Sequence, residues 1–139
     1  MTNQVVIYTD GGARGNPGPA GAGAVVVVGG KEAATVSKFL GRQTNNWAEY
    51  EALILALEAA RTHVPHVQSK QVAVRMDSEL IVKQMQGVYK VRDPELKKKH
   101  ATVTQLIAEH FGTVSFTHVR RENNERADEL ANLAMDRGR

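Results

Sequence analysis

The segment from Gln4 to Thr9 contains four successive apolar residues, Val-Val-Ile-Tyr, so a strand built from it has two apolar faces. Such a strand is stable only when both faces are covered, which places it in the centre of a sheet. Two more β-rich segments follow, 21–28 and 32–40, and Gly29-Gly30-Lys31 between them predicts an antiparallel hairpin. The first forty residues therefore predict a sheet with a buried central strand.

Helical and strand patterns alternate in the rest of the chain. A helix is predicted from Thr44 or Asn45, either of which can cap it, to about Arg61, because apolar residues recur there at helical spacing. The other predicted elements are a strand over 71–76, a helix from Glu79 to about Gln86, a helix from Asp93-Pro94 to near His110, a strand over 113–118 and a helix that opens at Asn123 or Asn124. This order predicts an α/β fold: a mixed five-stranded sheet, with a three-stranded antiparallel start and parallel strands after it, flanked by helices.

Composition narrows the class of protein further. The chain has 139 residues, and that length predicts a single domain over 1–139. It has no cysteine, which excludes disulfides, thiolate metal sites and a cysteine nucleophile. No apolar run is long enough to cross a bilayer and no secretory signal pattern opens the chain, so we expect a cytoplasmic protein that does not contact a membrane. A net charge of +3 is compatible with a polyanionic partner.

Four carboxylates stand where a binding site is expected. Asp10 follows the first predicted strand and Asp77 the fourth, while Glu49 and Asp128 lie in the first turns of two predicted helices. In α/β sheets, sites form at the carboxyl ends of the strands, so these acids can converge. Their mutual repulsion would then require a hard cation, and a donor set of carboxylates alone selects Mg²⁺ or Mn²⁺.

The same four residues also have an ordinary structural interpretation. An acid near the start of a helix is favoured by the helix dipole alone, and Asp77 can act as the N-cap of the helix that follows it. Spacing by itself therefore leaves both interpretations open.

The residues around the acids are more specific than the acids themselves. They are, in chain order, Tyr8-Thr9-Asp10-Gly11-Gly12, Thr44-Asn45-Asn46-Trp47-Ala48-Glu49, Met76-Asp77-Ser78 and Asn124-Glu125-Arg126-Ala127-Asp128. In this order and at these spacings they resemble type 1 ribonuclease H, from about Val5 to Met135. The resemblance implies the ribonuclease H-like fold and two Mg²⁺ ions, for which Mn²⁺ can substitute. The implied metal ligands are Asp10, Glu49, Asp77 and Asp128.

The resemblance also implies an activity and a substrate. Members of this family hydrolyse the RNA strand of an RNA–DNA hybrid by two-metal-ion catalysis and leave 5′-phosphate and 3′-hydroxyl ends. The residues that match the family's contacts to 2′-hydroxyl groups are Asn16, Asn45 and Asn46, and those that match its contacts to a phosphate of the DNA strand are Arg42 and Thr44. We expect a monomer that binds the hybrid duplex.

The chain departs from the best-known members at two places. The loop before Asp128 is short and holds no histidine; Arg121 matches the arginine of a shorter-looped subgroup and is expected to contact a phosphate and help the product leave. His118 ends a strand and is interpreted as structural. The basic, tryptophan-rich protrusion of some relatives is missing from 87–92, and Lys97–Lys99 is either a partial substitute or an ordinary solvated helix face.

Two other functions are compatible with this fold. A catalytically silent hybrid-binding module is disfavoured because the full acid set is present, and a DNA-cutting nuclease or transposase is disfavoured by Asn16 and Asn45. Nicking of double-stranded RNA is a further expectation for a short-looped member. His63 and His66 have the spacing of a metal pair, but Pro65 between them predicts a loop and not a ligand site.

Overall fold

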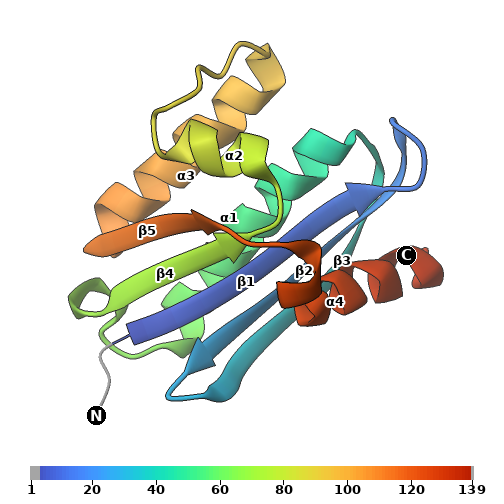
Figure 1. Ribbon diagram of the computed structural model, residues 1–139. Helices are drawn as coiled ribbons and strands as arrows, with labels where there is room; N and C mark the ends of the chain where they lie inside the picture. Colours follow the sequence, from blue (N-terminus) through green and yellow to red (C-terminus); the bar gives the residue numbers. More distant parts are fainter. Residues whose placement is uncertain (1–3, 139) are drawn as a thin grey trace.

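The computed structural model describes residues 4–138. Its centre is a five-stranded sheet in the order β3-β2-β1-β4-β5 (Figure 1). The strands are β1 (Gln4–Ala13), β2 (Gly18–Val28), β3 (Lys31–Gln43), β4 (Gln71–Met76) and β5 (Thr113–His118). Neighbours among the first three strands are antiparallel, whereas β4 is parallel to β1 and β5 is parallel to β4. The predicted mixed sheet is confirmed.

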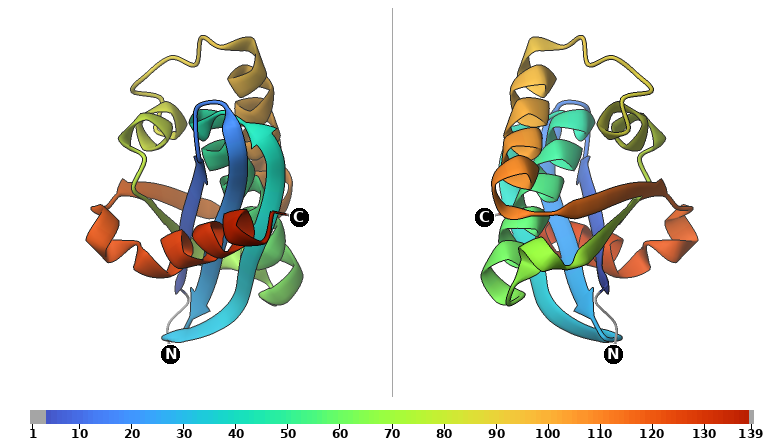
Figure 2. Two further views of the ribbon diagram at one scale, coloured as in Figure 1. Left: turned by 90° about the vertical axis from the view of Figure 1, so that its right-hand side faces the viewer. Right: turned by 90° about the vertical axis from the view of Figure 1, so that its left-hand side faces the viewer.

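Helices and two short 3₁₀ turns connect and cover the strands. They are α1 (Asn45–His63), η1 (Val67–Ser69), α2 (Glu79–Met85), α3 (Pro94–His110), η2 (Arg121–Asn123) and α4 (Glu125–Arg137). α1 and α3 pack side by side, whereas α4 packs across β2 and β3 (Figure 2). Within residues 4–138, no helix has the length and the apolar composition that crossing a bilayer requires.

The main core lies between the sheet and α1. Val5 and Ile7 of β1 are fully buried in one cluster with Leu53 and Leu57 of α1. Burial of each such side chain contributes about 1.5–3 kcal/mol to the free energy of unfolding. Because this cluster fixes α1 on the sheet, it also fixes the start of that helix, where Glu49 lies.

Hydrogen bonds confirm two of the predicted helix caps and contradict the proposed Asp77 cap, because the Ser78 hydroxyl oxygen accepts a 3.3 Å bond from the Ile81 amide and caps α2. Thr44 caps α1, and its hydroxyl oxygen accepts a 3.2 Å bond from the Trp47 amide. Asp93 caps α3, with Pro94 in the first turn. The last helix begins after Asn124, but the Asn124 side chain does not cap it and bonds to β1 instead.

The first two strands are longer than the sequence predicts. β1 continues to Ala13 and β2 begins at Gly18, so most of the glycine-rich segment 10–20, which lies between the predicted strands, is paired strand. Helices pack directly on the backbone here, since a Cβ on Gly11 or Gly23 would overlap a helix carbonyl. Tertiary packing thus extends the β1–β2 ladder through glycines, although glycine has a low strand propensity.

Candidate active site

The two central parallel strands separate at the site. β1 and β4 are paired only as far as Thr9 opposite Met76, whereas β1 remains paired with β2 beyond this point. The next residues are Asp10 on β1 and Asp77 after β4. Both acids therefore stand at the opening between these strands, at the end where ligands bind in α/β sheets.

Glu49 reaches this opening because α1 lies very close to β1. A Cβ on Gly11 would overlap the Ala48 carbonyl, so only glycine permits this approach. The Gly11 amide donates a 2.8 Å hydrogen bond to Glu49 Oε1. Glu49 is 7% exposed, and this bond holds its carboxylate beside Asp10.

Asp128 approaches from α4, on the opposite face of the sheet. Gly23 is the cross-strand partner of Asp10, and a Cβ on Gly23 would overlap the Ala127 carbonyl. Cross-strand partners share a face, whereas Asp10 and the adjacent Gly11 face opposite sides, so α4 and α1 lie on different faces. A side-chain contact with Asp128 contributes to the raised pKa of Asp10.

Three of the acids form a compact cluster, hereafter the acid cluster: one carboxylate oxygen each of Asp10, Glu49 and Asp77 lie within 4.8 Å of one another. Burial, followed by the charges of Glu49 and Asp77, raises the pKa of Asp10 from 3.8 to about 9. Burial also raises the pKa of Glu49 from 4.5 to about 7, against the lowering effect of the Gly11 hydrogen bond. Carboxylates this close are stable in their charged form only beside a cation, and their oxygen donors suit Mg²⁺ or Mn²⁺. The residues present therefore fit a divalent-ion site.

The acid cluster lines a cavity of about 380 Å³. Asn45 and Asn46 line it from the start of α1, and Arg121 lines it from η2. The structure thus brings Arg121 to the acids from a loop on the far side of the opening.

Three polar side chains that were not predicted as site residues line the same cavity: Ser78, His118 and Arg120. A hydrogen bond from Ser78 lowers the pKa of Glu49. His118, interpreted from the sequence as structural, is exposed at the cavity, as is Arg120. The doubled arginine at 120–121 is the sequence signal that could have identified Arg120.

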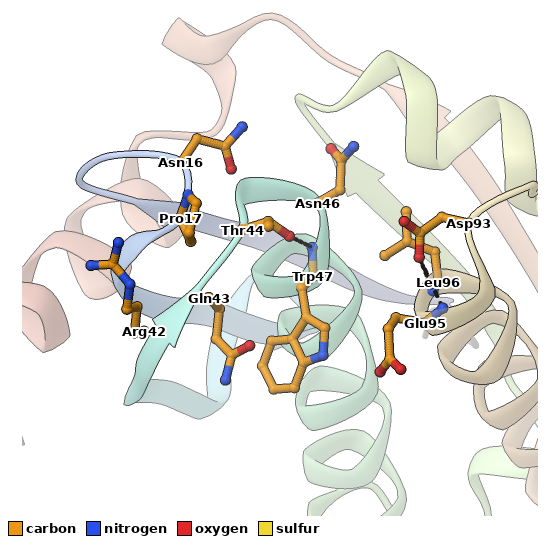
Figure 3. A pocket seen from close by; sticks show the side chains of 10 residues that line it. All are labelled: Asn16, Pro17, Arg42, Gln43, Thr44, Asn46, Trp47, Asp93, Glu95 and Leu96. Carbon is orange, nitrogen blue, oxygen red and sulfur yellow. Dashed lines mark hydrogen bonds between the residues drawn. The ribbon is translucent and has the colours of Figure 1, made fainter.

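A second cavity, of about 470 Å³, adjoins the start of α1 (Figure 3). Its lining residues are Asn16, Pro17, Arg42, Gln43, Thr44, Asn46, Trp47, Asp93, Glu95 and Leu96. They include four of the five residues predicted to bind substrate, and the fifth, Asn45, lines the cavity of the acid cluster. Because Asn46 lines both cavities, these residues form one surface with the acids.

Asn16 and Asn45 tie the β1–β2 turn to α1. Asn16 Oδ1 accepts a 3.0 Å bond from the Asn45 amide, and Asn45 Oδ1 accepts a 2.8 Å bond from the Ala13 amide. The alternative that Asn45 caps α1 is wrong, because Thr44 does so. Within the described part of the chain, both side-chain amino groups remain available as donors.

The lysines of 97–99 do not form one exposed patch. Lys99 Nζ lies 2.8 Å from Glu51 Oε1 and 3.7 Å from the centroid of the Trp47 ring, and its side chain is 15% exposed. Lys98 is 77% exposed. Lys99 therefore joins α3 to α1 and belongs neither to a solvated face nor to a substitute for the missing protrusion.

His63 ends α1, and His66 lies in the following loop, as Pro65 predicts. Among residues 4–138, the acid cluster is the only group of three His, Cys, Asp or Glu side chains within ligating distance. Neither histidine belongs to such a group.

The fold and the site together define a class: an α/β protein whose central strands open on a carboxylate cluster of the kind that serves phosphoryl-transfer chemistry. A family model described as reverse transcriptase-like matches residues 8–134. This match covers the sheet from Tyr8 onward, α1 and all four predicted metal ligands.

Individual relatives are more specific. Ribonuclease H from Escherichia coli is 34% identical over 151 residues, covering 96% of this chain and 90% of the relative. Ribonuclease HI from Halobacterium salinarum is 46% identical over 134 residues, covering 96% of this chain but only 65% of the relative's length. The solved structure of LC11-RNase H1, isolated from compost, is 52% identical and covers 98% of both chains with a TM-score of 0.92. The chain belongs to the ribonuclease H family.

Proposed function

We propose that this chain is an endoribonuclease that hydrolyses the RNA strand of RNA–DNA hybrids and leaves 5′-phosphate and 3′-hydroxyl ends. The observation that carries the proposal is the surface that runs from the acid cluster to the second cavity through Asn46. It combines acids for metal ions with side chains that match the family's contacts to both strands. A neighbour, LC11-RNase H1, has been solved in complex with an RNA/DNA hybrid; it is 51% identical, covers 96% of this chain and 97% of its own, and has a TM-score of 0.92.

We assign two Mg²⁺ ions, replaceable by Mn²⁺, to Asp10, Glu49, Asp77 and Asp128. When bound, such ions lower the pKa of an attacking water and neutralise charge on the phosphate and on the leaving 3′-oxygen. The chain keeps the carboxylates in place through the Gly11 amide, which bonds to Glu49, and through the packing of α4 on β2. Because burial and neighbouring charges raise the pKa values of Asp10 and Glu49, cation binding is expected to be accompanied by proton release.

The two strands of the hybrid meet different side chains. Asn16 and Asn45 present amino donors of fixed orientation, since backbone amides hold their carbonyl oxygens. Donors held in this way can contact the 2′-hydroxyl groups that distinguish RNA from DNA. The Arg42 guanidinium is exposed beside Thr44 and, within residues 4–138, has no ion pair, so it is available for a phosphate of the DNA strand.

Arg121 is exposed at the edge of the acid cavity. A guanidinium stays charged at any working pH, so Arg121 cannot transfer protons but can attract a phosphate. We assign it a phosphate contact that assists product release. Arg120 adds positive charge to the same edge. The presence of Arg121 at this edge supports membership of the shorter-looped subgroup.

The proposal is tested by incubating the protein with a labelled hybrid, double-stranded DNA and double-stranded RNA of one sequence, with Mg²⁺ and with EDTA. Cleavage of the hybrid's RNA strand that requires Mg²⁺ and leaves 5′-phosphate ends would support it. Binding without cleavage would identify the silent module, and cleavage of duplex DNA would identify the DNA nuclease. The double-stranded RNA sample tests whether the protein also nicks double-stranded RNA.

We also propose that the protein is a monomer, which light scattering tests, and that it is cytoplasmic, which cell fractionation tests.

Asp10→Asn and Asp77→Asn supply the matched controls. Each removes a charged donor from the acid cluster but keeps the side-chain shape. We expect cleavage to fall by at least ~10³-fold in both, with hybrid binding unchanged within about threefold, because the phosphate contacts are untouched. Retained turnover in either variant would remove that residue from the ligand set.

A further inference from the structure

The segment after β5 lines the opening between β1 and β4. The last ladder pair of these strands is Thr9 opposite Met76. The Met76 carbonyl accepts a 2.8 Å bond from the Val119 amide, and the Thr9 carbonyl accepts a 2.9 Å bond from Asn124 Nδ2. Buried backbone carbonyls need such partners. The first bond continues the β4–β5 ladder past its last pair, Met76 opposite His118. The second bond gives a partner to the Thr9 carbonyl at the point where β1 and β4 separate.

The Asn124 side chain makes this bond instead of capping α4. It directly precedes α4, where asparagine commonly caps a helix, but its side chain makes no cap bond. The residue is 1% exposed. Its own backbone carbonyl accepts a 3.1 Å bond from the Asp128 amide in the first turn of α4. Asn124 therefore links β1 directly to the start of α4.

This link joins two of the proposed metal ligands. The Thr9 carbonyl and the Asp10 amide belong to one peptide plane. The bond from Asn124 to this carbonyl therefore restrains the orientation of the backbone at Asp10. The bond from the Asp128 amide restrains the other acid. Asn124 is therefore a buried link between the segments that carry Asp10 and Asp128, in addition to the packing of α4 on Gly23.

Two unpaired atoms indicate that packing is not the reason for an amide at this position. Asn124 Oδ1 and Thr9 Oγ1 are buried and have no hydrogen-bond partner in the described part of the chain. A buried polar atom without a partner costs about 1–3 kcal/mol. An apolar side chain of similar volume would avoid part of that cost at Asn124. What it could not do is donate to the Thr9 carbonyl.

We propose that Asn124 is a positioning residue, which sets the separation of Asp10 and Asp128 and thereby the affinity of the site for divalent ions. The metal site belongs to the proposed function, but ion binding can be measured without nucleic acid. A residue that only stabilised the fold would change the unfolding midpoint and leave the ion affinity of the folded protein unchanged.

Asn124→Ala and Asn124→Leu both remove the donor, and the leucine variant keeps the branching and the number of heavy atoms of the side chain. Asn123→Ala is the matched control, because Asn123 is exposed and lies one residue earlier. Mn²⁺ binding to each folded protein is measured by calorimetry, the folded fraction by circular dichroism, and hybrid cleavage at saturating Mg²⁺. Both Asn124 variants should bind Mn²⁺ about 10–100-fold more weakly than the natural protein, as for other residues that orient metal ligands. We also expect a lower kcat with KM for the hybrid unchanged within about twofold, because the substrate contacts are intact.

Mn²⁺ affinity within about twofold of the natural protein in the leucine variant would overturn this inference, since effects that small are ordinary for residues with no role at a site. A fall that only follows the unfolded fraction, or an equal fall in Asn123→Ala, would overturn it as well. Failure of the natural protein to cleave hybrid would instead overturn the proposed function. In that case the Mn²⁺ affinities would still decide the role of Asn124.

Discussion

Gly23 lies opposite Asp10 in the β1–β2 ladder, and the Ala127 carbonyl of α4 rests against it. Gly11, next to Asp10 along β1, receives α1 in the same way on the other face. Each helix thus touches bare backbone one residue before it contributes an acid. The packing of two helices on these two glycines therefore decides how far their acids lie from Asp10.

Gly23→Ala should displace α4, because the new Cβ would overlap the Ala127 carbonyl. We expect a loss of about 1–3 kcal/mol in the free energy of unfolding, as in other overpacked sites. Hybrid cleavage by the folded protein should fall by at least ~10-fold, because a small misplacement of a reacting group has large effects on rate. Thermal unfolding measures the loss of stability. The kcat for hybrid cleavage, determined at a temperature well below the unfolding midpoint, measures the loss of activity.

Gly12→Ala is the stability control for this experiment. It adds the same methyl group to β1, but the nearest atom, Asn45 Oδ1, is 3.9 Å from the new Cβ, an ordinary contact. We expect an unfolding midpoint close to that of the natural protein. If Gly23→Ala unfolds at the same temperature as Gly12→Ala, this result would contradict the close packing of α4 on Gly23.

Asp10→Asn should stabilise the protein when divalent ions are absent, and the gain should grow with pH. The pKa of Asp10 is raised from 3.8 to about 9, so between these values the native state keeps a proton that the unfolded state has lost. The free energy of unfolding of the natural protein therefore falls as pH rises through this window. Asparagine does not titrate, so the variant escapes this loss.

The difference between Asp10→Asn and the natural protein should be near zero at pH 4 and reach about 5 kcal/mol by pH 8, because each pH unit in this window contributes about 1.4 kcal/mol. Urea unfolding in EDTA measures it. Saturating Mg²⁺ should reduce the difference, because cation binding stabilises the charged cluster of the natural protein. A difference that is constant from pH 4 to pH 8 would contradict the raised pKa of Asp10.

Lys99→Ala should destabilise the fold, whereas Lys98→Ala should not. Lys99 loses a 2.8 Å ion pair with Glu51 and its position over the Trp47 ring, both in a largely buried place. We expect a loss of about 1–3 kcal/mol in the free energy of unfolding for Lys99→Ala. For the exposed Lys98 we expect less than about 0.5 kcal/mol. Urea unfolding distinguishes the two, and equal effects would show that Lys99 does not join α3 to α1.

Arg42→Ala should weaken hybrid binding and lower its salt dependence. Loss of one phosphate contact reduces the slope of log affinity against log salt concentration by about 1, with little change in kcat. The matched control is Arg61→Ala, which removes an exposed arginine near the opposite end of α1. Fluorescence anisotropy with Asp10→Asn as background measures binding without cleavage. An unchanged slope would remove Arg42 from the phosphate contacts.

Local patterns in the sequence were sufficient for the order of the elements and for most of the helix starts. Thr44 and the Asp93-Pro94 pair act within one helical turn, so their roles do not depend on the rest of the fold. The placement of Asp10 and Asp77 after strands follows from the same local patterns. The motifs around the acids were sufficient for the family.

The roles of Asn45, Lys99 and Asn124 could not be predicted, because each depends on a partner far away in the chain. Asparagine commonly caps a helix, but the Asn45 side chain bonds to Ala13. Lys99 belongs to a lysine run, but its side chain is partly buried between two helices. Asn124 precedes a helix but bonds to a strand 115 residues earlier.

The sequence alone determined which elements form, in what order, and which carboxylates end them, because hydrophobic period, caps and turns act over a few residues. Only the tertiary structure decided that β1 and β4 part after Thr9, and that two helices approach closely enough to bring Glu49 and Asp128 to Asp10. The positions of these helices depend on close packing between segments that are distant in the chain. The absence of a single Cβ there changes the spacing of a helix and a strand.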